Sequence, residues 1–333
     1  MMDLQRVNAY MSKVEESEKN VLPHEGKRLK TGLDLGTAYI VLVVLDENNQ
    51  PVACEKRAAS VLRDGVVVDY SGACRIVREL KEKLEERLGE ELIDCAIAMP
   101  AGTESSTRTH QYVAESAGFE VTNVVDEPTA ANAIYQISDG VVVDIGGGTT
   151  EVAVVSLGGV VESESIKTAG DAFDEAIVRY VRRKHNILIG KRTAEELKIG
   201  IACLVPRAEV GIQEVKGRCL TTGLPKSVKI SSVELVEAIA EPARDILETI
   251  HMVLERTPPE LVADLAQNGI IMAGGGSLIY GFDQLVEKDT GIRTTVVDDA
   301  LSCAAFGSGK MLMNLNDMQD GMVNLARKRQ MKA

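Results

Sequence analysis

The segment VVVDIGGGTT, residues 141–150, decides the fold of this chain: an acid, three glycines and two threonines follow a run of valines. A turn between two strands needs one glycine or two. Three in a row beside a carboxylate and hydroxyls indicate that a ligand comes close to the backbone, because glycines let N–H groups converge on an oxyanion without Cβ atoms in the way. The segment therefore predicts a β-hairpin whose loop binds an anion.

The same plan occurs earlier in the chain. GLDLGTAYIVLVVL (residues 32–45) is again a strand, an acid, a loop with glycine and threonine, and a second strand. Two further pairs match in the same order: IDCAIAMPAGT (93–103) with GIIMAGGGS (269–277), and VTNVVDEPTAANA (121–133) with TTVVDDALSCAAFG (294–307). An ordered set of correspondences indicates an internal duplication. Because strands alternate with helices in both halves, we predict an α/β fold with two similar lobes.

The spacing of the repeats divides the chain. We expect an N-terminal amphipathic helix and linker over residues 1–29, lobe I over 30–140, lobe II over 141–297, and a C-terminal helix returning to lobe I with a basic tail over 298–333. The second lobe is longer than the first, which predicts an inserted subdomain at about residues 186–232. Periodicity and composition predict helices at residues 73–87, 107–117, 172–184, 232–255 and 282–288.

Composition limits the partners. The net charge of −13 disfavours nonspecific binding to nucleic acid or to anionic lipid, because both would be repelled. No stretch approaches 18 uninterrupted apolar residues, so we expect no transmembrane segment. The six cysteines show no metal-ligand spacing, which is typical of reduced core cysteines in a cytoplasmic protein.

Two acid–glycine–threonine loops facing each other across duplicated lobes would form a phosphate clamp. Threonine hydroxyls can add donors, and Asp34 and Asp144 at the strand ends suit Mg²⁺ held through its water shell. The alternative is a pair of tight hairpins with solvated acids, and the third glycine segment, AGGGS, argues against it. The chain lacks both the P-loop pattern and a GxGxxG at a strand-to-helix turn, which argues against those nucleotide folds.

The joint set of motifs resembles the superfamily of actin, the DnaK chaperones and sugar kinases, over about residues 30–312. DLGT and DIGGGTT are similar to its two phosphate motifs, AGGGS to its adenosine motif, and DEPTAANA and DDALSCAAFGSG to its two connecting helices. The resemblance implies two ribonuclease-H-like lobes with ATP or ADP and Mg²⁺ in the cleft between them. Up to about Val143 the chain resembles the ethanolamine-utilisation protein EutJ, and from Asp144 it resembles the bacterial actin MreB.

The resemblance also implies roles for individual residues. The phosphates and, through water, Mg²⁺ would lie beside Asp34, Gly36, Thr37, Asp144, Gly146, Gly147, Gly148, Thr149 and Thr150. The segment that closes near the phosphates would contribute Gly170 and Asp171, and the adenosine would contact Glu195, Lys198, Gly274, Gly275, Gly276 and Ser277. Glu127 is similar to the acid that positions the attacking water, with Thr149 or Thr150 helping.

Three of these assignments have plain alternatives. Gly170 and Asp171 could simply begin a helix, and Glu195 and Lys198 could form a helical salt bridge. Glu127 could be an acid that interacts favourably with a helix dipole.

One departure from MreB and actin concerns the subdomain called IB, which helps to form filament contacts. Only about 26 residues separate Thr37 from Asp64, so we expect this subdomain to be missing. The resemblance then leaves three functions open. The main interpretation is an ATP-driven, chaperone-like accessory of a bacterial microcompartment, and the alternative is an MreB-like cytoskeletal filament. A small-molecule kinase is less favoured, because the sequence shows no sugar-binding feature.

The N-terminal segment enters the first two hypotheses. Leu4, Val7, Met11 and Val14 follow the spacing of one helix face. Residues 1–20 could be a free targeting helix for shell or cargo proteins, or a membrane or bundling element. The equally open alternative is a helix docked on the body of the protein.

Overall fold

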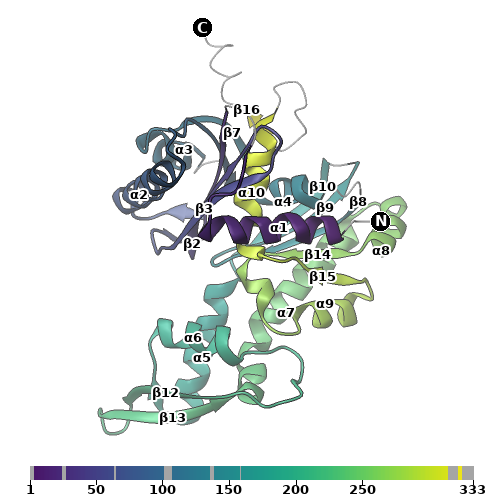
Figure 1. Cartoon of the computed structure of the whole chain (residues 1–333). Helices are drawn as coiled ribbons and strands as arrows, with labels where there is room; N and C mark the ends of the chain where they lie inside the picture. Colours follow the sequence, from purple (N-terminus) through teal and green to yellow (C-terminus); the bar gives the residue numbers. More distant parts are fainter. Residues whose placement is uncertain are drawn as a thin grey trace.

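The computed structural model of the chain describes residues 4–24, 28–63, 65–100, 107–135, 139–157, 159–313 and 322–324. Two mixed sheets, each with helices packed against it, form the two expected lobes (Figure 1). The α/β class predicted from the sequence is confirmed. The basic tail expected at the C-terminus lies outside the described residues.

Lobe I is built on a six-stranded sheet in the order β16-β7-β6-β1-β2-β3. Its strands are β1 (Lys30–Leu35), β2 (Tyr39–Leu45), β3 (Pro51–Ala58), β6 (Asp94–Met99), β7 (Glu120–Asp126) and β16 (Met322–Asn324). One face is covered by α2 (Tyr70–Leu88) and α3 (Thr107–Ser116), and the other by α4 (Glu127–Tyr135) and α10 (Cys303–Lys310). Side chains of β2 alternate between these two cores, because neighbouring residues of a strand point to opposite faces.

Lobe II repeats the plan with a five-stranded sheet in the order β10-β9-β8-β14-β15. Its strands are β8 (Asp139–Ile145), β9 (Thr150–Ser156), β10 (Gly159–Ile166), β14 (Ile270–Ala273) and β15 (Thr294–Val296). Its helices are α5 (Gly170–His185), α7 (Ser232–Arg256), α8 (Pro259–Asn268) and α9 (Phe282–Thr290). In both lobes an antiparallel three-strand meander pairs in parallel with the next strand of the sheet, as an internal duplication predicts.

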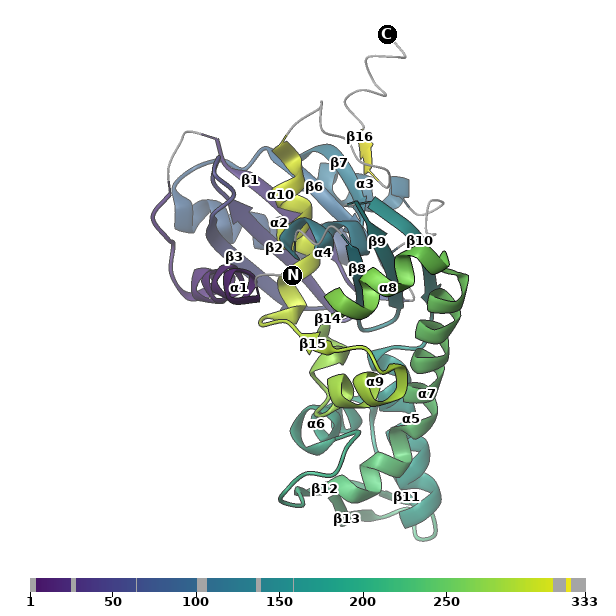
Figure 2. The ribbon, with the colours of Figure 1, turned by 90° about the vertical axis from the view of Figure 1, so that its right-hand side faces the viewer.

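A small sheet lies at the end of lobe II that points away from lobe I (Figures 1 and 2). It consists of β11 (Ile187–Leu188), β12 (Ile212–Cys219) and β13 (Pro225–Ser231), with α6 (Lys191–Ile201) beside it. In lobe I the corresponding connection is short. Between β3 and α2 the chain forms only the hairpin of β4 (Leu62–Arg63) and β5 (Val66–Val67), with Asp64 not described, so the expected absence of subdomain IB is confirmed.

The helices begin where capping residues allow it. Helix α2 starts three residues earlier than predicted, because the carboxylate of Asp69 accepts a hydrogen bond from the Gly72 N–H at 2.9 Å. Helix α7 begins with a capping box between Ser231 and Glu234. No helix among the described residues is both long and apolar enough to span a bilayer.

The N-terminal helix α1 (Leu4–Lys19) is docked on the body of the protein. Met11 and Val14 are fully buried in a core to which β2, β3, α4 and α10 contribute. In Figure 1 the helix lies beside β3. The side chains of Leu4 and Val7 lie outside those described. The described half of the apolar stripe, Met11 and Val14, is therefore covered by the body of the protein. The docked helix, one of the two interpretations of the sequence, is therefore the one that the structure has.

Candidate functional site

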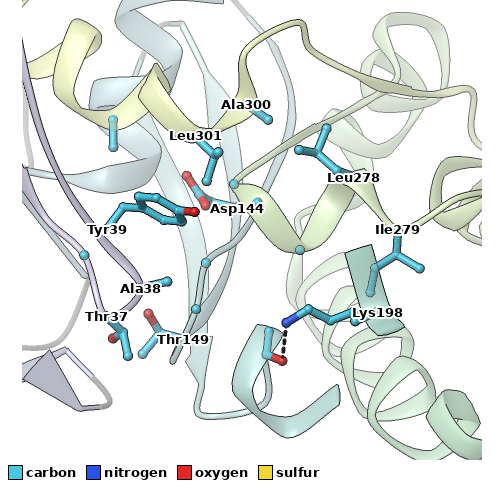
Figure 3. Close-up of a pocket in the computed structure, with 18 of the residues that line it drawn as sticks. Thr37, Ala38, Tyr39, Asp144, Thr149, Lys198, Leu278, Ile279, Ala300 and Leu301 are labelled. Carbon is cyan, nitrogen blue, oxygen red and sulfur yellow. Dashed lines mark hydrogen bonds between the residues drawn. The ribbon is translucent and has the colours of Figure 1, made fainter. Parts of the chain in front are cut away.

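A cavity of about 380 Å³ lies between the two lobes and is lined by both predicted phosphate loops (Figure 3). Among the residues singled out from the sequence, its lining contains Asp34, Gly36, Thr37, Glu127, Asp144, Gly146, Gly147, Thr149, Gly170, Glu195, Lys198, Gly274, Gly275 and Gly276. Four lie outside the lining: Gly148, Thr150, Asp171 and Ser277.

The two phosphate loops touch each other across the cleft. The β1–β2 hairpin contributes Gly36, Thr37 and Ala38, and the β8–β9 hairpin contributes Gly146 and Gly147. A Cβ atom on Gly147 would lie 2.8 Å from the Cβ and 3.0 Å from the amide nitrogen of Ala38. This close approach requires glycine, and it places the backbone of both loops beside the same space.

Helix α5 begins directly behind the second loop. The N–H groups of Gly170 and Asp171 donate to the carbonyl oxygens of Gly146 and Gly147 at 3.0 and 2.7 Å. The Asp171 carboxylate pairs with Lys191 at 3.0 Å instead of reaching the cavity. The start of the helix thus fixes the loop, while of the two residues only Gly170 lines the cavity.

The glycine segment after β14 closes the opposite side. Gly274 has a φ of +76°, and a Cβ atom on it would lie 2.3 Å from Asp144 Oδ1 and 2.4 Å from the carbonyl oxygen of Ile145. Its N–H donates to the carbonyl oxygen of Ala300 at 3.1 Å. Only glycine satisfies both the backbone angle and the contact. Gly274 therefore lies between the end of β8 and Ala300, which precedes the returning helix α10.

Three acids meet at the base of the cavity. Burial and the nearby Asp144 raise the pKa of Asp34 to about 8, and burial raises the pKa of Asp144 to about 7. Burial, followed by the charge of Glu151, raises the pKa of Glu127 well above its ordinary value. A cluster of carboxyls with raised pKa values is typical of a site where a cation or a reacting group neutralises the charge.

Mg²⁺ fits this cluster as a water-bound ion. Asp34 Oδ1 is buried without a hydrogen-bond partner among the described residues, so a donor such as a Mg²⁺-bound water would satisfy it. Within the described ranges no three His, Cys, Asp or Glu side chains gather closely enough to bind a metal ion directly. Mg²⁺ retains several waters in such sites, which agrees with that arrangement.

Glu127 begins α4 but is not its cap. The cap is Asp126, whose carboxylate accepts from the Thr129 N–H at 2.8 Å. Glu127 instead lines the cavity with Asp34 and Asp144. The helix geometry therefore leaves its carboxylate available to the cleft.

Two residues that were expected to contact the ligand point elsewhere. The Thr150 hydroxyl donates to the carbonyl oxygen of Thr168 at 2.7 Å, because neighbouring side chains on β9 alternate and Thr149 takes the cavity side. The Ser277 hydroxyl donates to the carbonyl oxygen of Gly274 at 2.7 Å and is buried. Both hydroxyls are thus bonded within the loops, and neither Thr150 nor Ser277 lines the cavity.

Lys198 connects α6 to the first turns of α5, the helix that begins behind the second phosphate loop. Its Nζ pairs with the Asp174 carboxylate at 2.9 Å and donates to the Gly170 carbonyl oxygen at 3.0 Å (Figure 3). Its ion pair is therefore with Asp174 on α5 and not with Glu195 on its own helix. Lys198 and Glu195 both line the cavity.

The sequence did not single out several other residues of the lining. Arg207 lies over the ring of Tyr280, with its guanidinium carbon 4.6 Å from the ring centroid. Ile199 and Leu278 also belong to the lining and are exposed. Tyr39 lies on the lobe I side (Figure 3). Glu151, opposite Asp144 in the β8–β9 ladder, lies outside the lining but raises the pKa of Glu127, and it was also missed. Only its place two positions after Thr149 on the same strand face could have identified it.

Comparison with known proteins agrees with this geometry. A family model described as "MreB/Mbl protein" matches residues 53–320. The cell shape-determining protein Mbl of Bacillus subtilis (strain 168) is 34% identical over 321 residues, which cover 86% of this chain and 96% of that protein. The cell shape-determining protein MreB of Escherichia coli (strain K12) is 38% identical over 270 residues, 78% and 77% of the two chains.

Two solved structures share the fold. MreB5 of Spiroplasma citri bound to ADP superposes with a TM-score of 0.75 at 31% identity, over 84% of this chain and 95% of that one. The ethanolamine utilization protein EutJ from Carboxydothermus hydrogenoformans gives a TM-score of 0.73 at 28% identity, over 92% and 99%. The two-lobed actin-like fold expected from the sequence is confirmed.

The comparisons change one part of the sequence interpretation. The family model runs through residues 143 and 144, so the likeness to MreB begins well before the second phosphate loop. EutJ is a structural neighbour over nearly the whole chain and not only over its first half. The chain belongs to the MreB/Mbl family of actin-like proteins.

Proposed function

We propose that this protein is an MreB-like ATPase that binds MgATP in the cleft, hydrolyses it slowly and assembles into cytoskeletal filaments. The observation that carries the proposal is the convergence of two glycine hairpins and three acids on one cavity, in a chain of the MreB/Mbl family. A relative of known structure, MreB5 of Spiroplasma citri, is bound to ADP.

The phosphates lie between the β1–β2 and β8–β9 hairpins in this proposal. Backbone N–H groups of both loops and the hydroxyls of Thr37 and Thr149 face the phosphate oxygens. The adenosine lies toward the Gly274 segment and α6, where Glu195 and Lys198 line the cavity with the stacked pair of Arg207 and Tyr280. Apolar walls with a few polar groups suit a purine and its ribose.

Glu127 positions the water that attacks the terminal phosphate. It lines the cavity at the same level as Asp34 and Asp144, and Asp126 takes over the capping of the helix. Mg²⁺, held through water by Asp34 and Asp144, would neutralise phosphate charge. Phosphoryl transfer depends mainly on such positioning and charge stabilisation, so this site needs no covalent intermediate.

Hydrolysis in this cleft would change the orientation of the two lobes relative to each other. One phosphate loop belongs to each lobe, so the nucleotide bridges them. The connecting helices α4 and α10 pack tightly, since a Cβ atom on Gly307 would lie 1.9 Å from the Ala130 carbonyl oxygen. Loss of the terminal phosphate removes contacts between the loops and lets the lobes rotate about that crossing.

The proposed assembly into filaments is supported by the relatives, which are cell shape-determining proteins. A second function has its own observation. The chain covers 99% of EutJ from Carboxydothermus hydrogenoformans, and its connection from β3 to α2 is a single short hairpin. These two observations support a small, microcompartment-associated accessory ATPase as the second candidate function.

Sedimentation with MgATP, with MgADP and without nucleotide separates the two functions, when phosphate release is measured on the same samples. A filament-forming ATPase pellets with MgATP and releases phosphate. An accessory ATPase releases phosphate but stays in the supernatant. A small-molecule kinase consumes ATP only when an acceptor is added. If the protein neither binds nor hydrolyses MgATP, the proposed function is wrong.

A further inference from the structure

Helix α1 lies next to the point where the chain crosses from lobe II to lobe I. Tyr10 packs against Phe306 of α10, with ring centroids 6.3 Å apart, and Lys310 of the same helix lies over the Tyr10 ring. Lys310 also donates to the Ala133 carbonyl oxygen of α4 at 2.7 Å. Met11 and Val14 share a core with Ala131 and Ile134 of α4, so the N-terminal helix contacts both helices that connect the lobes.

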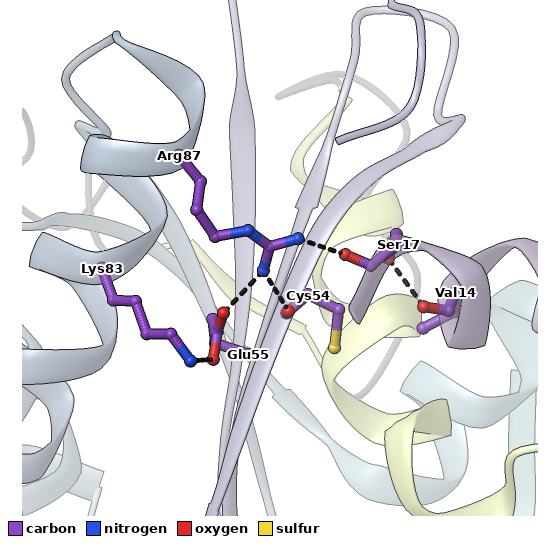
Figure 4. A network of polar contacts seen from close by, with 6 residues as sticks. All are labelled: Val14, Ser17, Cys54, Glu55, Lys83 and Arg87. Carbon is purple, nitrogen blue, oxygen red and sulfur yellow. Dashed lines mark hydrogen bonds and ion pairs between the residues drawn. The ribbon is translucent and has the colours of Figure 1, made fainter. Parts of the chain in front are cut away.

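The C-terminal end of α1 is fastened to lobe I by a polar network (Figure 4). Arg87 donates to the Ser17 carbonyl oxygen at 2.8 Å, to the Cys54 carbonyl oxygen at 2.9 Å and to Glu55 at 2.6 Å. Lys83 pairs with the other carboxylate oxygen of Glu55 at 2.6 Å. Ser17 is fully buried. The end of α1 is therefore held in one position on β3.

That position brings Glu18 to Lys56, which also faces Asp299. The Lys56 Nζ lies 2.5 Å from Glu18 Oε1 and 3.7 Å from Asp299 Oδ1. The Asp299 side chain is only 7% exposed. The positive charge of Lys56 offsets the repulsion between the two carboxylates and the cost of burying that of Asp299. Without it, the carboxylate of Asp299 would be left without this charge partner.

Asp299 is the residue at which the cavity wall begins. It has a φ of +44°, an uncommon conformation for a residue other than glycine, and the following residues Ala300 and Leu301 line the cavity. The Ala300 carbonyl oxygen accepts from the Gly274 N–H of the adenosine-side segment. Any shift of Asp299 therefore moves the wall against which the nucleotide lies.

We propose that α1 is a positioning element of the nucleotide site, which acts through Glu18, Lys56 and Asp299 to hold the Ala300–Leu301 wall against the bound nucleotide. The proposal rests on the proposed nucleotide binding. Because the coupling of binding free energies is reciprocal, docking of α1 tightens nucleotide binding, and the bound nucleotide holds α1 in place. Most changes of affinity appear in the dissociation rate, so we expect docked α1 to slow release of the nucleotide.

The test measures release of MgADP with a fluorescent group on its ribose, in the full-length protein, after a chase with excess MgATP. Lys56→Met removes the charge and keeps the aliphatic chain. Lys56 is partly exposed, so we expect the release rate to rise by about fivefold, at the lower end of coupling effects. Glu18→Gln should raise the release rate less, and Lys56→Arg, which keeps the positive charge, should release MgADP at the wild-type rate. Glu16→Gln, a charge-neutralising change at an exposed position of the same helix, should leave the release rate unchanged.

Hydrogen exchange supplies the reciprocal readout. The amides of α1 should exchange more slowly in wild type with MgADP than without it, and this protection should be lost in Lys56→Met. If Lys56→Met releases MgADP at the wild-type rate, α1 only stabilises the fold and the proposal is wrong. If Lys56→Met does not fold, the release rate of Glu18→Gln decides in the same way. If wild type itself does not bind MgADP, the proposed function fails first, which separates the two claims.

Discussion

The contact between Gly147 and Ala38 makes a sharp prediction about the phosphate clamp. In Gly147→Ala the new Cβ would lie 2.8 Å from the Ala38 Cβ. Carbon atoms in contact prefer about 3.5–4.0 Å, so the two hairpins must move apart by about 1 Å. Displacing groups that position a substrate by 1 Å can cost about 10²-fold in rate. We therefore expect kcat for ATP hydrolysis to fall about 10²-fold, with weaker MgATP binding.

Phosphate release and equilibrium binding of MgATP measure this effect. Ala38→Gly in the Gly147→Ala background removes the carbon–carbon clash and should restore part of the rate, since the Ala38 amide nitrogen still lies 3.0 Å from the new Cβ. Gly190→Ala is the matched control, because a Cβ there meets nothing within 4 Å. Wild-type hydrolysis by Gly147→Ala would show that the two loops do not jointly hold the phosphates.

Three further predictions follow from the acids and from α1. Glu127→Ala should bind MgATP nearly normally but hydrolyse it about 10²–10⁴-fold more slowly, whereas Asp144→Ala should weaken binding itself; wild-type turnover of Glu127→Ala would reduce Glu127 to a helix-terminus charge. The pKa values of Asp34 and Asp144 are raised to about 8 and about 7. Between about pH 4 and those values the folded protein binds more protons than the unfolded chain, so the free energy of unfolding without nucleotide should fall from pH 6 to pH 8. Asp34→Asn should remove much of that fall in thermal melts, and an unchanged pH dependence would contradict the assignment. Met11→Ala should cost about 2–5 kcal/mol of stability, because a buried side chain leaves a cavity, while Lys13→Ala should change it by less than about 0.5 kcal/mol. Equal melting temperatures for these two variants would mean that α1 is not docked in solution.

The phosphate loops could be predicted because their chemistry is local. Acid, glycines and threonine follow one another within a few residues, and glycine requirements such as that of Gly274 are visible as a motif. The duplicated order of elements then predicted that the two loops would face each other. The short β3–α2 connection was likewise visible as a missing length of chain.

Side-chain directions and long-range pairs could not be predicted in this way. Thr149 and Thr150 look equivalent in the sequence, and only the pleat of β9 separates the residue facing the cavity from the one bonded to Thr168. Arg207 and Tyr280 meet through folding of two separate segments, without a local pattern. The amphipathic stripe of α1 showed that the helix has an apolar face but not whether the protein or a partner covers it.

The most direct test of the central claim is a thermal melt of the full-length protein with and without MgATP. A ligand at about 100 times its Kd adds about 2.7 kcal/mol to the free energy of unfolding. For a chain of this size we expect the melting temperature to rise by several degrees, and Asp144→Ala to lose most of that rise. A melting temperature unmoved by millimolar MgATP in the wild-type protein would contradict nucleotide binding in the cleft.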